Sequence, residues 1–148
     1  MIKSFLKDKD KPKKRKISRA GLIKKLDAIF STFIRLRDTD ANGYGKCITS
    51  GQFIHFDNAD CGHFISRNNM ATRYAEKNCN LQGRQDNRFL SGRQYEHGLA
   101  INNKWGKGTA EMLLIKSKSR VHFHPFELET MIKHYQQQVD VLKKKKNI

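Results

Sequence analysis

Three polar residues, His63, Asn78 and Asn87, are spaced along the chain in a way that could serve the hydrolysis of a phosphate ester. His63 lies in the short apolar run DCGHFI, Asn78 follows in an extended segment, and Asn87 lies where a helical pattern restarts. Such hydrolysis needs a base for the attacking water, a cation for the developing negative charge, and a group that holds the base. We therefore expect His63 to be the general base, Asn78 to orient its imidazole, and Asn87 to offer an oxygen to Mg²⁺ or Mn²⁺.

Two arginines near His63 are candidates for phosphate contact. Arg67 follows His63 closely, and Arg73 precedes the segment that carries Asn78. A planar guanidinium matches two phosphate oxygens at once, so we expect both side chains to bind the phosphate backbone. The alternative for His63, taken alone, is a solvated or hydrogen-bonded structural side chain, which is the commoner role for a single histidine in a strand.

The composition favours nucleic acid as the partner. The chain has 148 residues, with 30 Lys and Arg against 14 Asp and Glu, and a formal net charge of +16. This length is typical of one domain, and this charge predicts binding to polyanions through counterion release. No run approaches the roughly 20 apolar residues that a membrane-spanning helix needs. Three cysteines and the lack of a secretory signal pattern indicate a cytoplasmic protein that is not secreted.

Residues 1–17 are expected to form a basic flexible arm, because Lys and Arg dominate there and apolar residues are scarce. We expect Lys13, Lys14 and Arg15 of this arm to contact DNA, and a solubilising tail without a specific role is the alternative. Residues 18–148 are then expected to form a single domain.

Helices are expected at both ends of that domain. Ser18 suits the N-cap of a first helix, whose apolar residues recur at steps of three and four. Pro125 suits the start of a last helix, whose regular apolar stripe we expect to belong to the core. Residues 47–82 lack this period and predict short strands and loops. Shorter helices are expected after Asp86 and Thr109, each acting as an N-cap.

The order of His63, Asn78 and Asn87 is that of an HNH-type ββα-metal nuclease site. The sequence also resembles the phage recombination endonucleases of the NinG or Rap family, from about Leu26 to Leu142. The stretches that carry this resemblance are FIRLRD, CITSG, DCGHFISR, TRYAEKN, QGRQDN and SGRQYEHGL. The residues that match the family pattern in order are Asp60, Gly62, His63, Arg73, Glu76, Asn78, Gln82, Asn87, Ser91 and Gly92.

The resemblance implies an α+β fold. It implies a mainly helical domain around a ββα-metal (His-Me finger, HNH) nuclease core at about residues 47–100, with flanking N- and C-terminal helices. It also implies that Asp60 is the carboxylate that completes the metal site with Asn87. The alternative for Asp60 is a hydrogen-bonded turn residue.

The chain departs from the family at the positions of a structural zinc. The family carries two C-x-x-C pairs that hold this ion. Here the first pair is reduced to Cys47 and Ser50, and Gly83 and Asp86 replace the second. Because one thiol cannot form a tetrahedral zinc cage, we expect no structural zinc.

Our leading hypothesis from the sequence is a metal-dependent DNA endonuclease of the HNH type. The resemblance implies branched substrates such as D-loops, flaps or Holliday junctions, in phage or mobile-element recombination within a bacterial host cytoplasm. Two alternatives stay open, a non-catalytic basic nucleic-acid-binding protein and a sequence-specific HNH homing or restriction-type nuclease. A homodimer would suit a symmetric junction, and the last helix could supply its interface.

Overall fold

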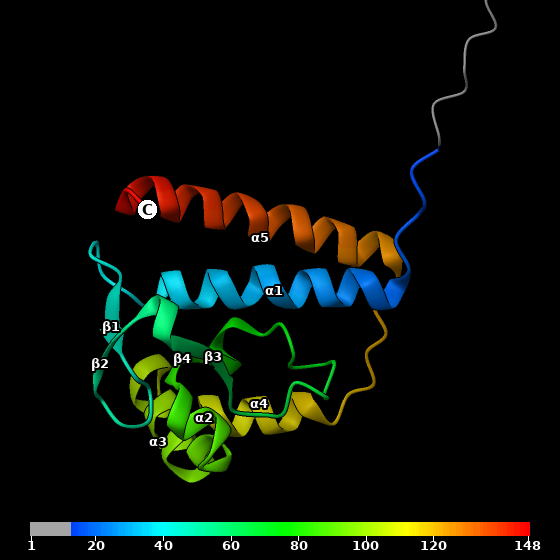
Figure 1. The fold of residues 1–148 in the computed structure, drawn as a ribbon. Coiled ribbons are helices and arrows are strands. Elements are labelled where there is room, and N and C mark those ends of the chain that lie inside the picture. Colours follow the sequence, from blue (N-terminus) through cyan, green and yellow to red (C-terminus); the bar gives the residue numbers. More distant parts are fainter. Residues whose placement is uncertain (1–12) are drawn as a thin grey trace, which may run out of the picture.

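The computed structural model describes residues 13–148 and has a mixed α+β architecture, which confirms the predicted fold class at that level (Figure 1). The helices are α1 (Arg19–Arg37), α2 (Arg84–Arg88), α3 (Gln94–Trp105), α4 (Thr109–Ser117) and α5 (Pro125–Lys146). The strands are β1 (Tyr44–Lys46), β2 (Phe53–His55), β3 (Ala59–His63) and β4 (Cys79–Gly83). Three single 3₁₀ turns, η1 (Phe56–Asn58), η2 (Glu76–Asn78) and η3 (Ser91–Arg93), connect them.

The two long helices α1 and α5 lie side by side and run in the same direction (Figure 1). Ser18 caps α1 as predicted, because its Oγ accepts a hydrogen bond from the Gly21 amide at 3.1 Å. Helix α5 begins at Pro125, also as predicted, and His124 is its N-cap. The two apolar stripes are buried against each other through Leu22, Leu26, Phe30, Phe33, Leu128, Ile132, Tyr135 and Val139.

This packing confirms that the apolar stripe of α5 belongs to the core. The stripe is buried against α1 and is therefore not available as a dimer interface.

Aromatic contacts fix the two long helices to the rest of the chain. The ring of Phe30 lies 4.9 Å from that of Tyr135 and 5.5 Å from that of Tyr74, edge to face in both pairs. Tyr74 precedes β4, so the same cluster anchors the segment that leads into the hairpin.

Strands β3 and β4 form an antiparallel hairpin, and β1 and β2 form a second one. The register of the first hairpin pairs Ala59 with Gly83 and His63 with Cys79. Helix α1 packs on this hairpin, and α2 follows β4 without a break. The prediction of short strands and loops for residues 47–82 is confirmed.

Two predicted helix caps are wrong. Helix α2 begins at Arg84 with Gly83 as its N-cap, and Asp86 lies inside the helix because its side chain turns toward Cys47 and Thr49. Gly108 is the N-cap of α4, and Thr109 is its first residue, whose hydroxyl donates to the Gly106 carbonyl.

The structure describes residues 13–17 of the predicted basic arm, just ahead of α1. Lys13, Lys14 and Arg15 are exposed and irregular in structure. Residues 1–12 of that arm lie outside the described residues. Among the helices of residues 13–148, none combines the length and the apolar character that a membrane crossing requires.

Candidate active site

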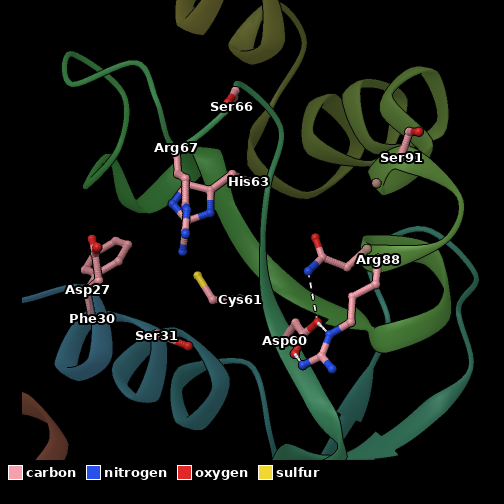
Figure 2. Close-up of a pocket in the computed structure, with 12 residues that line it drawn as sticks. Asp27, Phe30, Ser31, Asp60, Cys61, His63, Ser66, Arg67, Arg88 and Ser91 are labelled. Atoms are coloured by element: carbon pink, nitrogen blue, oxygen red, sulfur yellow. Dashed lines mark hydrogen bonds and ion pairs between the residues drawn. The ribbon is translucent and has the colours of Figure 1, made fainter. Parts of the chain in front are cut away.

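A polar cleft of about 500 Å³ opens between α1, β3 and the segment from α2 to Gly92 (Figure 2). It brings together the predicted base, both predicted metal ligands and one of the two predicted phosphate-binding arginines. The residues that line it are Asp27, Phe30, Ser31, Asp60, Cys61, His63, Ser66, Arg67, Asn87, Arg88, Ser91 and Gly92.

His63 is the last residue of β3, and its ring is held by a backbone carbonyl. Its Nε2 lies 3.0 Å from the carbonyl oxygen of Arg73. Because a carbonyl can only accept a hydrogen bond, Nε2 carries the proton of the neutral ring and Nδ1 keeps the lone pair. This is the arrangement that a general base requires.

The surroundings of His63 favour the neutral ring. Burial lowers the pKa of His63 below its ordinary value, and the positive charges of Arg73 and Arg67 act in the same direction. The hydrogen bond to the Arg73 carbonyl and the negative charge of Asp27 oppose this shift without cancelling it. The imidazole is therefore uncharged near pH 7 and able to accept a proton.

The guanidinium of Arg73 is committed to the protein itself. Its Nε donates to Asp27 Oδ1 at 2.9 Å, and its Nη1 donates to the Arg67 carbonyl at 2.8 Å. Tyr74 adds a hydroxyl hydrogen bond to Asp27 at 2.8 Å. These contacts differ from the predicted phosphate contact. They fix the backbone of Arg73, and through its carbonyl they fix the ring of His63.

The side chain of Asn78 makes no hydrogen bond to the ring of His63, in contrast to its predicted role. Its side chain is fully buried, and its Oδ1 accepts from the Ile65 amide at 2.8 Å. Its Nδ2 donates to the carbonyls of Ile65 and Thr72, both at 3.1 Å. Asn78 thus ties together the two ends of the 64–78 segment that carries the Arg73 carbonyl. Its effect on His63 is indirect, through this segment.

Asp60 and Asn87 meet at the other side of the cleft, as predicted. Asn87 Nδ2 donates to Asp60 Oδ2 at 2.9 Å, and Arg88 binds both carboxylate oxygens at 2.7 Å. Partial burial acts to raise the pKa of Asp60. The hydrogen bonds from Arg88 and Asn87, together with the charges of Arg88 and Arg84, outweigh it and lower that pKa. The carboxylate is therefore ionised.

The donor atoms of Asp60 and Asn87 suit a hard divalent ion only after both side chains leave their present contacts. Carboxylate and amide oxygens are suitable ligands for Mg²⁺ or Mn²⁺, and Asp60 and Asn87 already touch. The guanidinium of Arg88 occupies both oxygens of Asp60, so it must withdraw before a cation can bind there. Asn87 turns its Nδ2 toward Asp60, so its amide must also rotate before its oxygen can face the same ion.

His63 and Asp60 project from opposite sides of β3, because side chains separated by an odd number of residues alternate along a strand. Figure 2 shows His63 and Cys61 on one side of the strand and Arg88 on the other. Within residues 13–148, β3 pairs with β4 alone, so its other edge carries no strand. The lining of the cleft includes side chains from both faces of β3, namely Asp60 on one face and Cys61 and His63 on the other.

Arg67 lines the cleft and is exposed. Within the part of the chain that the structure describes, its guanidinium makes no hydrogen bond to another residue. It is therefore placed for the phosphate contact that the sequence predicts. Lys13, Lys14 and Arg15 lie before the start of α1 and do not line the cleft.

Three of the four positions that the resemblance assigns to zinc cysteines, Cys47, Gly83 and Asp86, are joined by polar contacts. The Gly83 amide donates to Cys47 Sγ at 3.2 Å, and the Cys47 thiol points to Asp86 Oδ2 at 3.7 Å. Thr49 donates its hydroxyl to the same carboxylate oxygen and accepts a hydrogen bond from Gln82 Nε2. A hydrogen-bond network therefore joins the two loops.

Sequence reasoning missed two side chains that shape the cleft. Arg88 follows Asn87 directly and binds Asp60, but nothing in its local pattern distinguishes it from the other arginines of a basic chain. Asp27 offered a signal, because it is the one acidic residue of α1 and it borders the apolar stripe at Leu26 and Phe30.

The features above define a small, basic α+β protein with a histidine held at the edge of a two-stranded hairpin, in a cleft that also holds a carboxylate. In the comparison with family models, the model of the bacteriophage lambda NinG protein matches residues 3–146, and the chain therefore belongs to the NinG family. This membership indicates a phage protein related to recombination. Comparisons with curated proteins and with solved structures gave no match.

Proposed function

We propose that this protein is a metal-dependent DNA endonuclease of the HNH class that cleaves branched DNA. The observation that carries the proposal is the state of His63. A neutral imidazole donates Nε2–H to the Arg73 carbonyl and keeps the Nδ1 lone pair, in a cleft shared with the oxygen ligands Asp60 and Asn87.

Each residue of the cleft has a separate role in the proposed hydrolysis. His63 Nδ1 removes a proton from the attacking water, and the Arg73 carbonyl stabilises the imidazolium that results through its hydrogen bond to Nε2–H. Asp60 and Asn87 would hold Mg²⁺ or Mn²⁺, which supplies positive charge to the developing negative charge on phosphorus oxygens. Arg67 binds the phosphate, and Arg88 joins it after leaving Asp60.

The choice of substrate rests on charge and on the family. A net charge of +16 supports binding to the phosphate backbone, which carries no sequence information. The NinG family relates the chain to phage recombination, whose intermediates are branched DNA. Recognition of backbone shape therefore explains both observations.

The direct test incubates the protein with a four-way junction, a flap and a matched linear duplex, in Mg²⁺, Mn²⁺ or EDTA. Wild type is expected to cut the branched substrates only with a divalent metal. His63→Ala should cut none of them, and His122→Ala, which removes an exposed histidine far along the chain, should behave as wild type.

Other results would change the assignment. Tight DNA binding without cleavage under any metal would identify a non-catalytic binding protein, in which the Asp60–Arg88 ion pair persists. Discrete cuts in the linear duplex, with indifference to branching, would identify a sequence-specific nuclease. Cleavage by His63→Ala at the wild-type rate would remove His63 as the base.

A further inference from the structure

Two cysteines share the face of the β3–β4 hairpin on which His63 lies. Cys61 precedes His63 by two residues on β3, and Cys79 is paired with His63 across the hairpin. Side chains two residues apart on a strand, and those directly opposite on its partner, point to the same face. The ligand atoms of Cys61, His63 and Cys79 all lie within 4.8 Å of one another.

We propose that Cys61, His63 and Cys79 form a second metal site, which binds a thiophilic divalent cation such as Zn²⁺ and thereby blocks the base. The binding site stands on the geometry of the hairpin alone. Its inhibitory effect rests on the proposed nuclease function, because it acts through the same imidazole.

The distances suit zinc after a small adjustment. A tetrahedral Zn²⁺ binds sulfur at about 2.3 Å and imidazole nitrogen at about 2.0 Å, which places its ligand atoms between about 3 and 4 Å apart. The observed limit of 4.8 Å needs a closure of at most roughly 1 Å, which small rotations of the three side chains can supply.

The site is open on one side. Cys61 and His63 line the cleft, whereas Cys79 is completely buried behind them. Figure 2 shows Cys61 and His63 on the same side of β3, facing α1. An ion entering from the cleft would gain three protein ligands and keep a fourth position for water or a phosphate oxygen.

The chemistry of the ligands separates this site from the one at Asp60 and Asn87. Thiolate and imidazole select zinc-like ions, whereas carboxylate and amide oxygens select Mg²⁺ or Mn²⁺. Binding of Zn²⁺ at the new site displaces the thiol protons of Cys61 and Cys79 to solvent. The positions of the family's structural zinc are different, since Cys47, Gly83 and Asp86 do not belong to this cluster.

Ion binding and base catalysis exclude one another at His63. Nε2 is engaged by the Arg73 carbonyl, so the ring has one lone pair to offer. A ring that gives this lone pair to Zn²⁺ cannot take a proton from water. Zn²⁺ bound at this site would therefore inhibit cleavage through His63. Mg²⁺ would not inhibit it in this way, because thiolate and imidazole ligands do not select Mg²⁺.

Cobalt titration of the reduced, full-length protein tests the site without any activity measurement. One equivalent of Co²⁺ should produce the near-ultraviolet absorption of thiolate bound to cobalt, and Zn²⁺ should remove it. Cys61→Ser should lose this absorption; Cys61 is half-buried, so this variant is expected to fold. Cys79→Ser should lose it as well, and Cys47→Ser, the matched control, should keep it.

The outcomes decide the site in either direction. Absence of the thiolate absorption in wild type, or its survival in Cys61→Ser, would overturn the proposal. Its loss in Cys47→Ser alone would assign the metal to the family's zinc positions instead.

The inhibitory effect is measured as single-turnover cleavage at fixed Mg²⁺ with increasing Zn²⁺. Saturating Zn²⁺ should slow wild type about 100-fold, the lower end of what a general base contributes. The same Zn²⁺ concentration should lower the cleavage rate of Cys61→Ser by less than about twofold relative to the rate of that variant without Zn²⁺. Equal inhibition of both proteins would refute the blocking of His63. If wild type cuts no DNA at all, the nuclease proposal fails, and the cobalt spectrum still decides the metal site.

Discussion

At the scale of single residues, the state of His63 depends on groups that lie far away in the sequence. The Asp27 carboxylate binds the Arg73 guanidinium, and the Arg73 carbonyl binds Nε2 of His63. Asn78 ties together the two ends of the 64–78 segment that carries Arg73. Each of these contacts joins residues that local sequence cannot relate. The imidazole is therefore positioned by the backbone, and the backbone is positioned by a partly buried ion pair and a buried amide.

The lowered pKa of His63 predicts the pH dependence of cleavage. Only the neutral ring accepts a proton, so the single-turnover rate should rise with pH and level off. Its midpoint should lie below the ordinary value of about 6.5 for histidine, because burial disfavours the charged ring. A rate profile between pH 4.5 and 8 at constant ionic strength measures this midpoint. A midpoint above the ordinary value would contradict the neutral, desolvated ring.

Replacement of Asn78 should destabilise the fold. Asn78→Ala leaves the Ile65 amide and the Ile65 and Thr72 carbonyls without their partner in a buried place. We expect the free energy of unfolding to fall by about 3 kcal/mol. Urea denaturation measures this change, with Asn68→Ala, an exposed asparagine of the same segment, as the control. Equal stability of the two variants would show that the Asn78 contacts contribute little.

At the scale of elements, the two long helices were predicted together with their starts, whereas the short helices α2 and α4 were predicted close to their positions but with the wrong N-caps. Helices α1 and α5 are amphipathic and capped, so periodicity and the residues Ser18 and Pro125 locate them. Helix α2 has only five residues, too few for a period, and the sequence placed its start at Asp86. The tertiary contacts of Asp86 with Thr49 and Cys47, which its helix-capping propensity cannot reveal, decide its role.

The site was predictable to a similar degree. The order of the motifs predicted that Asp60 and Asn87 lie together near His63. In the structure Asp60 and Asn87 are in contact, and His63 lines the same cleft. The partners of Arg73 and Asn78 could not be predicted, because they are backbone groups and a carboxylate from another element. Residue type reveals what a side chain can do, and only the fold reveals what it touches.

The hairpin and the β1–β2 connection should accept a zinc site if the thiols are restored. A Cβ built on Gly83 lies 3.8 Å from Cys47 Sγ, and Asp86 already contacts that sulfur. The triple variant Ser50→Cys, Gly83→Cys and Asp86→Cys should therefore bind Zn²⁺ and unfold at a higher temperature when loaded.

Thermal unfolding with and without Zn²⁺ measures this effect, and Ser50→Cys alone is the control because two thiols are too few. No zinc-dependent change in the triple variant would show that the loops have lost the geometry of the family's cage. The absence of a structural zinc from the natural sequence stays a prediction, which metal analysis of the purified protein tests.

At the scale of the whole molecule, charge and core are separated. The larger apolar cluster lies between α1, α5 and the hairpin, and a smaller one joins Phe64 and Ile65 to α3 and α4, while most lysines and arginines of residues 13–148 are exposed. If DNA binds mainly through phosphates, the affinity should fall steeply as the salt concentration rises. The logarithm of the binding constant should fall against the logarithm of the salt concentration with a slope of about 0.9 for each phosphate contact. Partnership with DNA and a homodimer both stay predictions.

The basic arm makes a testable contribution to this slope. Replacing Lys13, Lys14 and Arg15 with alanine should reduce the slope of log affinity against log salt by about 2 to 3. The matched control replaces Lys143, Lys144 and Lys145, which lower the net charge equally at the end of α5. Fluorescence anisotropy with a labelled junction compares the two. Identical slopes would show that the arm supplies only its share of the general charge.

The central claim is that His63 takes the proton from water during DNA cleavage. The most direct measurement is single-turnover cleavage of a four-way junction with Mg²⁺ by His63→Ala, with and without added imidazole. We predict a loss of about 100-fold or more relative to wild type, partly restored by free imidazole in the cleft left by the ring. Cleavage by the folded variant at the wild-type rate, independent of imidazole, would contradict the account.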